Sequence, residues 1–114
     1  MSRAPKASAR WTEAAPVFAA LGDPTRLQLV ARLTGGPLSI SDLRDGTSVT
    51  RQAITKHLLA LANAGLVRDN WHGRERIWEL EPKRLDKARG WLDQISEQWD
   101  AAIGRLKTFV EDES

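Results

Sequence analysis

A row of apolar residues near the end of the chain constrains the fold more than any other feature of the sequence. From Leu85 to Val110 these residues recur at spacings of seven, three, four, four, three and four. This spacing lies on one face of an α-helix, and Pro82 suits the first helical position. We predict a helix over about 82–110, roughly 42 Å long. A domain of 114 residues cannot cover such a helix alone, so we expect part of the row to pack against another molecule.

Composition excludes several classes of protein. The length suits one compact domain, and the absence of cysteine rules out disulfides, thiolate metal sites, iron–sulfur clusters and cysteine redox sensing. No apolar run approaches the ~18 residues of a membrane span, and no signal-peptide pattern follows the N-terminus. We expect a cytoplasmic protein in which residues 1–10 form a disordered arm and residues 11–114 form the domain.

The positive charge is concentrated in the middle of the sequence. The whole chain has 17 basic and 15 acidic residues, a net charge of only +2. Between Thr50 and Arg76, five basic residues stand against two acidic ones, whereas from Lys83 onward seven acidic residues outnumber six basic ones. A basic segment inside a nearly neutral chain is typical of a surface that binds nucleic acid.

Capping residues and glycines divide the first part of the chain into helices. Asp23, Ser41 and Thr50 each precede a helical pattern, so we expect their side chains to cap the helices that follow. Gly46 and Gly65 suit helix ends. The predicted helices cover 12–21, 24–33, 42–45 and 51–64. A short helix, a turn containing glycine and a longer helix form the helix-turn-helix layout.

The helix predicted over 51–64 has two distinct sides at about 100° per residue. Its apolar residues share the side that we expect to pack inward: Ile54, Leu58 and Leu61. The opposite side suits base edges in a major groove, because Gln52 can bond adenine and Lys56 can reach guanine or a phosphate. Thr50 and Arg51 are suited to phosphate at the first turn. Taken alone, this pattern also fits an ordinary helix with a solvated side.

Two β-rich runs, 66–71 and 75–80, flank a short connection and predict a hairpin. Trp78 and Leu80 are two residues apart on one strand face, which we expect to pack inward. The tip and its surroundings carry polar and basic residues: His72, Gly73, Arg74 and Arg76, with Arg68 nearby. A basic tip beside a DNA-reading helix can lie along a phosphate backbone or enter a minor groove. Taken alone, the run also fits a surface hairpin with routine charges.

Three segments, in this order, resemble the ArsR-type winged-helix repressors. They are ALGDPTRLQLVARL (20–33), TRQAITKHLLALANAGLV (50–67) and HGRERIWEL (72–80). The likeness extends over about 11–106, and it is specific because the motifs occur together. It implies a mainly α fold with a small β-hairpin, that is, a winged helix-turn-helix. It further implies a homodimer that binds a palindromic operator in double-stranded DNA and represses transcription.

The resemblance also carries candidate residues onto this chain. It implies DNA contacts on the helix after the turn and on the hairpin tip, and dimer contacts on the helices around 12–21 and 82–110. With the patterns above, the DNA-binding candidates are Thr50, Arg51, Gln52, Thr55, Lys56, His57, His72, Gly73, Arg74 and Arg76. The dimerisation candidates are Phe18, Trp91, Leu92, Ile95, Trp99, Ile103, Leu106 and Phe109.

The chain departs from the family pattern where many members sense metals. The segment before the turn reads ISDLRDG and has no cysteine, and the C-terminal helix has carboxylates but no histidine. The chain therefore resembles the metal-independent branch, and we expect no metal site and no cofactor; the inducer is left open. The alternative is a metal-responsive repressor with an atypical site, in which His72 joins carboxylates at a dimer interface.

Other classes of function have less support in the sequence. The histidines, His57 and His72, have no cysteine or glycine-rich phosphate loop to work with, so we expect no enzyme. The main alternative is a winged helix that has become a protein-interaction module. Such a module favours aromatic residues and leucine on its exposed helix, whereas Arg51, Gln52 and Lys56 favour DNA.

Overall fold

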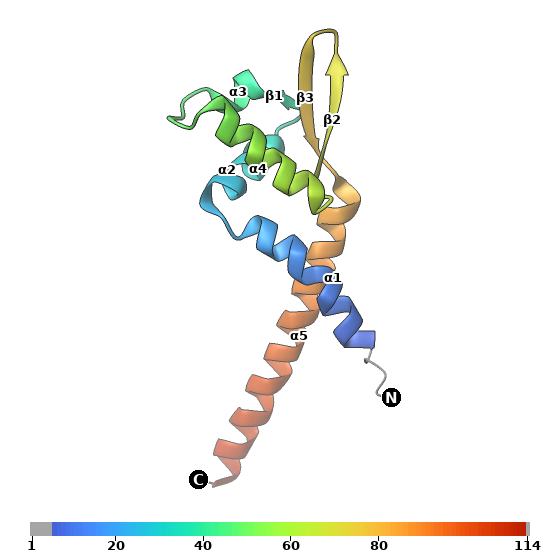
Figure 1. Cartoon of the computed structure of the whole chain (residues 1–114). Coiled ribbons are helices and arrows are strands. Elements are labelled where there is room, and N and C mark those ends of the chain that lie inside the picture. Colours follow the sequence, from blue (N-terminus) through green and yellow to red (C-terminus); the bar gives the residue numbers. More distant parts are fainter. Residues whose placement is uncertain (1–5, 114) are drawn as a thin grey trace.

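The chain forms a helical body from which a hairpin and a long helix project at opposite ends (Figure 1). The computed structural model describes residues 6–113. In chain order, the elements are α1 (Lys6–Leu21), α2 (Pro24–Leu33), β1 (Leu38–Ser39), α3 (Ile40–Arg44), α4 (Arg51–Asn63), β2 (Val67–His72), β3 (Glu75–Leu80) and α5 (Pro82–Glu113). The strands form one antiparallel sheet in the order β1-β3-β2. This mainly helical architecture with a small sheet confirms the predicted fold class.

Side-chain caps begin α2 and α4 at the predicted residues. The Asp23 carboxylate accepts a hydrogen bond from the Arg26 backbone amide at 3.0 Å, and Pro24 is the first residue of α2. The Thr50 hydroxyl oxygen accepts one from the Ala53 amide at 3.1 Å. Each bond satisfies an amide that the first turn of a helix leaves without a partner. The starts of both helices therefore follow from the capping signals in the sequence.

The helix before the turn starts earlier than predicted, because Ser39 rather than Ser41 caps it. The Ser39 hydroxyl accepts from the Asp42 amide at 3.1 Å, and the Asp42 carboxylate accepts from the Ser39 amide at 3.2 Å. This reciprocal capping requires an acceptor side chain three residues after the cap. Ser39 has Asp42 at that position, whereas Ser41 has Arg44.

The first helix also starts before its predicted boundary at residue 12. α1 begins at Lys6, inside the segment assigned to a disordered arm. Residues 6–10 contain two alanines, a lysine and an arginine, which all favour helix, so the helix extends through them. The rest of the predicted arm, residues 1–5, lies outside the described residues.

The predicted hairpin is present as β2 and β3, and it follows Gly65, whose φ of +79° ends α4. The third strand, β1, was not predicted. It pairs with β3 through two residues only, Leu38 opposite Trp78 and Ser39 opposite Ile77. A strand of two residues is too short to show the alternation by which strands are found in a sequence.

The core lies between α4, the sheet and the helices that pack on them. Its fully buried large side chains are Val17, Leu43, Ile54, Leu58, Leu61, Leu66 and Trp78. The predicted inward side of α4 and the inward position of Trp78 are therefore confirmed. Because this packing covers only one side of α4, the position of the helix is fixed while its other side is open to solvent.

α5 packs on the body only along its first part. Ala88 and Trp91 are buried, and the Trp91 ring meets the ring of Phe18 edge-on, with centroids 5.9 Å apart. Gln94 still accepts a hydrogen bond from Arg10 of α1, and the later part of α5 projects away from the body (Figure 1). The radius of gyration is 19.2 Å, whereas a compact domain of this size has about 13 Å. No helix in residues 6–113 is long and apolar enough to cross a membrane.

Candidate nucleic-acid interface

α4 presents the polar outer side that the sequence predicts. Gln52, Lys56 and Asn63 are exposed on it, opposite the buried leucines and isoleucine. Within the described residues, the side chain of neither Gln52 nor Lys56 makes a hydrogen bond or an ion pair. Their amide and ammonium groups are therefore free to meet base edges or phosphates.

Arg32 of α2 fixes the turn that orients α4. Its guanidinium donates to the backbone carbonyls of Asp42 at 2.7 Å, Leu43 at 2.8 Å and Asp45 at 3.1 Å. The last turn of a helix leaves its carbonyls without partners inside the helix, so Arg32 caps α3 from outside. This role of Arg32 could not be predicted from the sequence, because one long polar side chain gives no periodic signal.

The start of α4 is tied to α3 by a side-chain hydrogen bond. Arg51 Nη2 donates to Ser41 Oγ at 2.7 Å. The Thr55 hydroxyl donates to the Arg51 carbonyl at 2.9 Å, and the Thr50 oxygen is used by the helix cap. A guanidinium has five N–H donors, so Arg51 keeps most of its donors. Of the two residues predicted to bind phosphate, Thr50 and Arg51, Arg51 therefore keeps more donors for a ligand.

His57 lies away from the outer side of α4, contrary to its place among the predicted DNA contacts. Its Nδ1 is 3.4 Å from Arg26 Nη1 and 3.9 Å from Asp23 Oδ1. Both partners belong to the start of α2, because His57 flanks the buried side of α4 and faces that helix. The hydrogen bond from the Arg26 backbone amide, more than any other contact, lowers the pKa of the Asp23 carboxyl. His57 therefore joins α4 to α2.

The hairpin, hereafter the wing, turns at Gly73 and Arg74. Gly73 has a φ of +64°, a conformation that glycine adopts without strain. His72, Gly73 and Arg74 are all exposed, at the end of the wing that projects from the body (Figure 1). Arg74 makes no ion pair within the described residues. The tip predicted from the sequence is therefore a free basic end.

Arg76 differs from Arg74, because its guanidinium is held within the wing. Its Nε donates to Asp69 Oδ2 at 2.5 Å, and its Cζ lies 4.6 Å from the centre of the Trp78 ring and 6.0 Å from that of Trp71. Arg76 is thus a poor candidate for the direct DNA contact that was predicted. The same contacts draw attention to Trp71, an exposed residue that the sequence analysis did not select.

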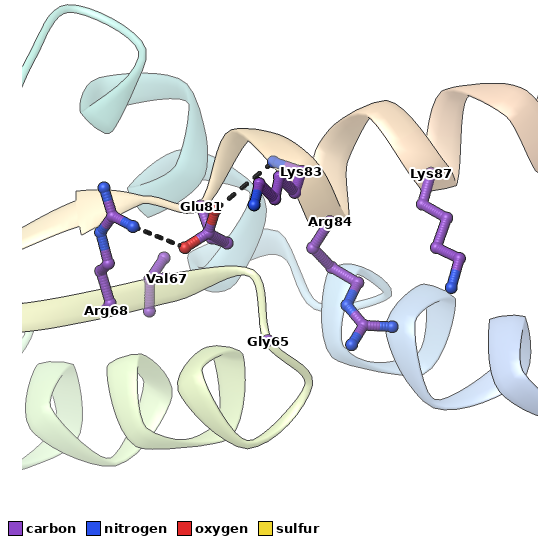
Figure 2. A pocket seen from close by; sticks show the side chains of 7 residues that line it. All are labelled: Gly65, Val67, Arg68, Glu81, Lys83, Arg84 and Lys87. Atoms are coloured by element: carbon purple, nitrogen blue, oxygen red, sulfur yellow. Dashed lines mark hydrogen bonds and ion pairs between the residues drawn. The ribbon is translucent and has the colours of Figure 1, made fainter.

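Another group of cations lies at the base of the wing, around a cavity of about 500 Å³ (Figure 2). The cations that line the cavity are Arg68, Lys83, Arg84 and Lys87. Arg68 donates to Glu79 at 2.9 Å and to Glu81 at 2.7 Å, and these hydrogen bonds and charges raise its pKa, Glu79 most of all. Glu13 of α1 forms ion pairs with two of the other cations, and the hydrogen bond from Lys87 lowers the pKa of Glu13. These contacts join α1, the wing and α5, and of the four cations only Lys83 has a side chain without a carboxylate partner in the described residues.

The projecting part of α5 carries a continuous apolar row. The side chains of this row are 43–66% exposed: Leu92, Ile95, Trp99, Ile103, Leu106, Phe109 and Val110. Trp91 is only 4% exposed, although it is among the predicted dimer contacts. It lies about 100° around the helix from Leu92, and it therefore faces Phe18 and the core of its own chain. Phe18, half-buried, is largely used in the same contact.

Metal ligands are not gathered in the part of the chain that the structure describes. No group of three or more histidine, cysteine, aspartate or glutamate side chains there could hold a metal ion. His72 lies at the wing tip, and the other histidine faces α2.

Sequence comparisons relate this chain to transcriptional regulators. A model of a helix-turn-helix domain matches residues 21–70. The HTH-type transcriptional regulator Rv2034 of Mycobacterium tuberculosis is 35% identical over 94 residues, which are 82% of this chain and 85% of that protein. The transcriptional repressor SdpR of Bacillus subtilis is 28% identical over 76 residues, which are 67% of this chain and 84% of that protein.

Solved structures give the same assignment from the fold. An ArsR-like transcriptional regulator from Rhodococcus sp. RHA1 superposes with a TM-score of 0.75 at 37% identity, over 89% of this chain and 95% of that one. The homodimeric winged helix-turn-helix DNA-binding domain Mb0332 of Mycobacterium bovis reaches 0.66 at 23% identity, over 86% of this chain and 90% of that one, and supports the fold alone. These relatives are regulators and not enzymes. The chain belongs to the ArsR-like family of winged helix-turn-helix transcriptional regulators.

Proposed function

We propose that this regulator represses transcription by binding a palindromic operator in double-stranded DNA as a homodimer. The observation that carries the proposal is the outer side of α4, where Gln52 and Lys56 are exposed and unpaired beside a wing whose Arg74 is also free. A relative at 28% identity is itself a transcriptional repressor, which favours repression over activation. Because such a protein acts on the chromosome, we infer a cytoplasmic location.

Each protomer would read DNA with α4 in a major groove. Gln52 and Lys56 would contact base edges, and Arg51 at the first turn would bind a phosphate with the donors that Ser41 leaves free. Arg74 at the wing tip would contact the neighbouring backbone or minor groove. Because the core packs against α4 and Arg32 fixes the end of α3 before it, little conformational freedom would be lost on binding.

A single α4 contacts too few base pairs to select one site in a genome. A second copy of the chain would supply a second α4, which contacts the other half of the operator. The apolar row of α5 gives this second copy a surface on which to pack, and it explains why the single chain is so extended. Two copies of α4 related by a twofold axis would enter successive major grooves about 34 Å apart. An operator of two inverted half-sites follows from that symmetry.

Selection of genomic fragments bound by the purified protein tests the proposal. We expect enriched fragments to share two inverted half-sites about one helical turn apart and to lie near promoters that the protein silences. Sedimentation of the free protein at micromolar concentration is expected to give the mass of a dimer. A protein that retains no duplex fragment, or binds DNA only as a monomer, would overturn the proposal. Enrichment of proteins instead would favour the interaction-module alternative.

A further inference from the structure

The wing carries an exposed indole that the proposed DNA contacts do not use. Trp71 is opposite Arg76 in the register of β2 and β3, and Asp69 is opposite Trp78. Side chains alternate between the two faces of a strand, so these four residues share one face of the wing. Trp78 is fully buried in the core, whereas Trp71, nearer the tip, is 65% exposed. The same face of the wing therefore changes from core to open surface along its length.

Arg76 supports the Trp71 ring from the side of the core. Its guanidinium lies between the two indoles, 6.0 Å from the Trp71 ring centre and 4.6 Å from that of Trp78. The hydrogen bond to Asp69 fixes the guanidinium in that place. An exposed aromatic ring that is already positioned loses little side-chain entropy when a ligand covers it. Trp71 is thus better suited to binding than an exposed tryptophan on a mobile tip.

The exposed ring forms one wall of a groove of about 520 Å³ between the wing and the starts of α3 and α4. Ser41 and Arg51 contribute to the opposite wall, and Arg74 also lines the groove. Arg51 is bound to a neutral hydroxyl, and neither it nor Arg74 forms an ion pair with a carboxylate in the described residues. Glu75 also lines the groove. The groove thus combines an apolar ring with one carboxylate and with two cations, Arg51 and Arg74, that form no ion pair within the described residues.

We propose that this groove binds the sugar–phosphate backbone of one DNA strand, with the Trp71 ring against a deoxyribose and Arg51 and Arg74 on the phosphates that flank it. The inference rests on the proposed function. In this arrangement α4 occupies a major groove of the DNA and the wing tip lies at the neighbouring minor groove. The DNA strand that separates these two DNA grooves has to pass between α4 and the wing, which is where the protein groove beside Trp71 lies. The alternation of anionic phosphate and apolar sugar along that strand matches the cations and the ring.

Substitution of Trp71 tests whether the uncharged indole contributes to DNA binding separately from the cations around it. Trp71→Ala is expected to weaken operator binding about tenfold and to leave the salt dependence of the affinity unchanged, because the indole carries no charge. Trp71→Phe should retain most of the affinity. The matched control is Asn70→Ala, the neighbouring exposed residue on the other face of the wing, which should bind like the wild type. Thermal unfolding of all variants verifies that they fold.

Tryptophan fluorescence gives an independent readout. Addition of operator DNA should change the emission of the wild-type dimer, and Trp71→Phe should remove most of that change. Normal affinity in Trp71→Ala, or an unchanged fluorescence response in Trp71→Phe, would overturn the groove proposal. If Gln52→Ala weakens binding in the same assay, the proposed function survives that result. If the wild type binds no duplex at all, the proposed function itself fails.

Discussion

α4 and the projecting part of α5 each have one side that is exposed to solvent in the single chain, but the two exposed sides differ in chemistry. On α4 the exposed side is polar, and its amide and ammonium groups are satisfied by water when nothing else is bound. On α5 it is apolar over several turns, and burial of such a surface gains about 25 cal/mol for each Å² removed from water. α5 therefore gains free energy from a permanent partner, whereas α4 can stand free until its ligand arrives. Exposure alone does not identify the partner, but the chemistry of the exposed atoms does.

The largest effect is expected from Trp99→Asp, which tests the apolar side of the comparison. Trp99 is 66% exposed in the single chain, and burial of its ring in a dimer would contribute about 2–3 kcal/mol. A carboxylate there would be buried without a partner in each copy. We expect monomers in sedimentation and loss of operator binding, while the fold of each chain is retained.

Ala101→Asp is the matched control for this substitution. Ala101 is exposed on the opposite side of α5 from Trp99, since two residues turn an α-helix by about 200°. The same new charge there should leave a dimer that binds DNA. A dimer that persists in Trp99→Asp would show that the apolar row is not the interface, and the contrast between α4 and α5 would lose its basis.

Substitutions on the polar side of α4 are expected to have the next largest effect. Gln52→Ala and Lys56→Ala should each cost about 1–3 kcal/mol of operator binding and relax the preference for individual bases. Neither side chain makes a hydrogen bond or an ion pair within the described residues, so the thermal stability of the dimer should change little. Binding of mutated operators by each variant measures both effects. Two variants with wild-type affinity would mean that another side of α4 faces DNA.

A smaller effect is expected from the cations of the wing. The salt dependence of operator affinity should distinguish the cations that are free from those that are paired with carboxylates. For roughly 6 phosphate contacts in the dimer, the slope of log affinity against log salt should be about −5. Arg74→Ala removes a free cation from each copy and should make the slope less steep by about 2. Arg68→Ala removes a cation that Glu79 and Glu81 already neutralise, and the slope should not change. Equal slopes in both variants would contradict this division.

Much of the fold could be predicted because it depends on local signals. The caps at Asp23 and Thr50, the inward side of α4 and the long helical row are all written in short stretches of sequence. β1 could not be found, since two residues show no period. The cap of α3 was misplaced by two residues, although the aspartate three positions after Ser39 provided the signal for the correct choice.

The residues of the candidate site were harder to predict than the fold, because the role of each one depends on contacts between residues far apart in the sequence. A basic residue near the tip of a hairpin looks the same in sequence whether it is free, as Arg74 is, or held between indoles, as Arg76 is. In the same way, nothing local distinguishes Trp91, which faces Phe18, from the exposed Trp99 eight residues later. The angle of each tryptophan around α5 limits which of them can face the core of its own chain. The position of α1, which carries Phe18, determines that Trp91 is the one that does so.

The smallest effect is expected at the covered side of α4, where Asp23 meets His57. The folded chain lowers the pKa of Asp23 below its usual 3.8, mainly through the hydrogen bond from the Arg26 amide. The stability that this carboxylate adds is therefore fully present above its unfolded pKa, and it is lost as pH falls through the lower, folded pKa. Asp23→Asn keeps an acceptor for the amide but cannot titrate.

We therefore expect Asp23→Asn to be slightly less stable than the wild type near pH 5, and the difference to shrink as pH falls below 3.8. Urea unfolding at several pH values measures it, and operator affinity at neutral pH should be nearly unchanged because Asp23 lies behind α4. A stability difference that stays constant with pH would mean that the carboxylate charge adds nothing at this junction.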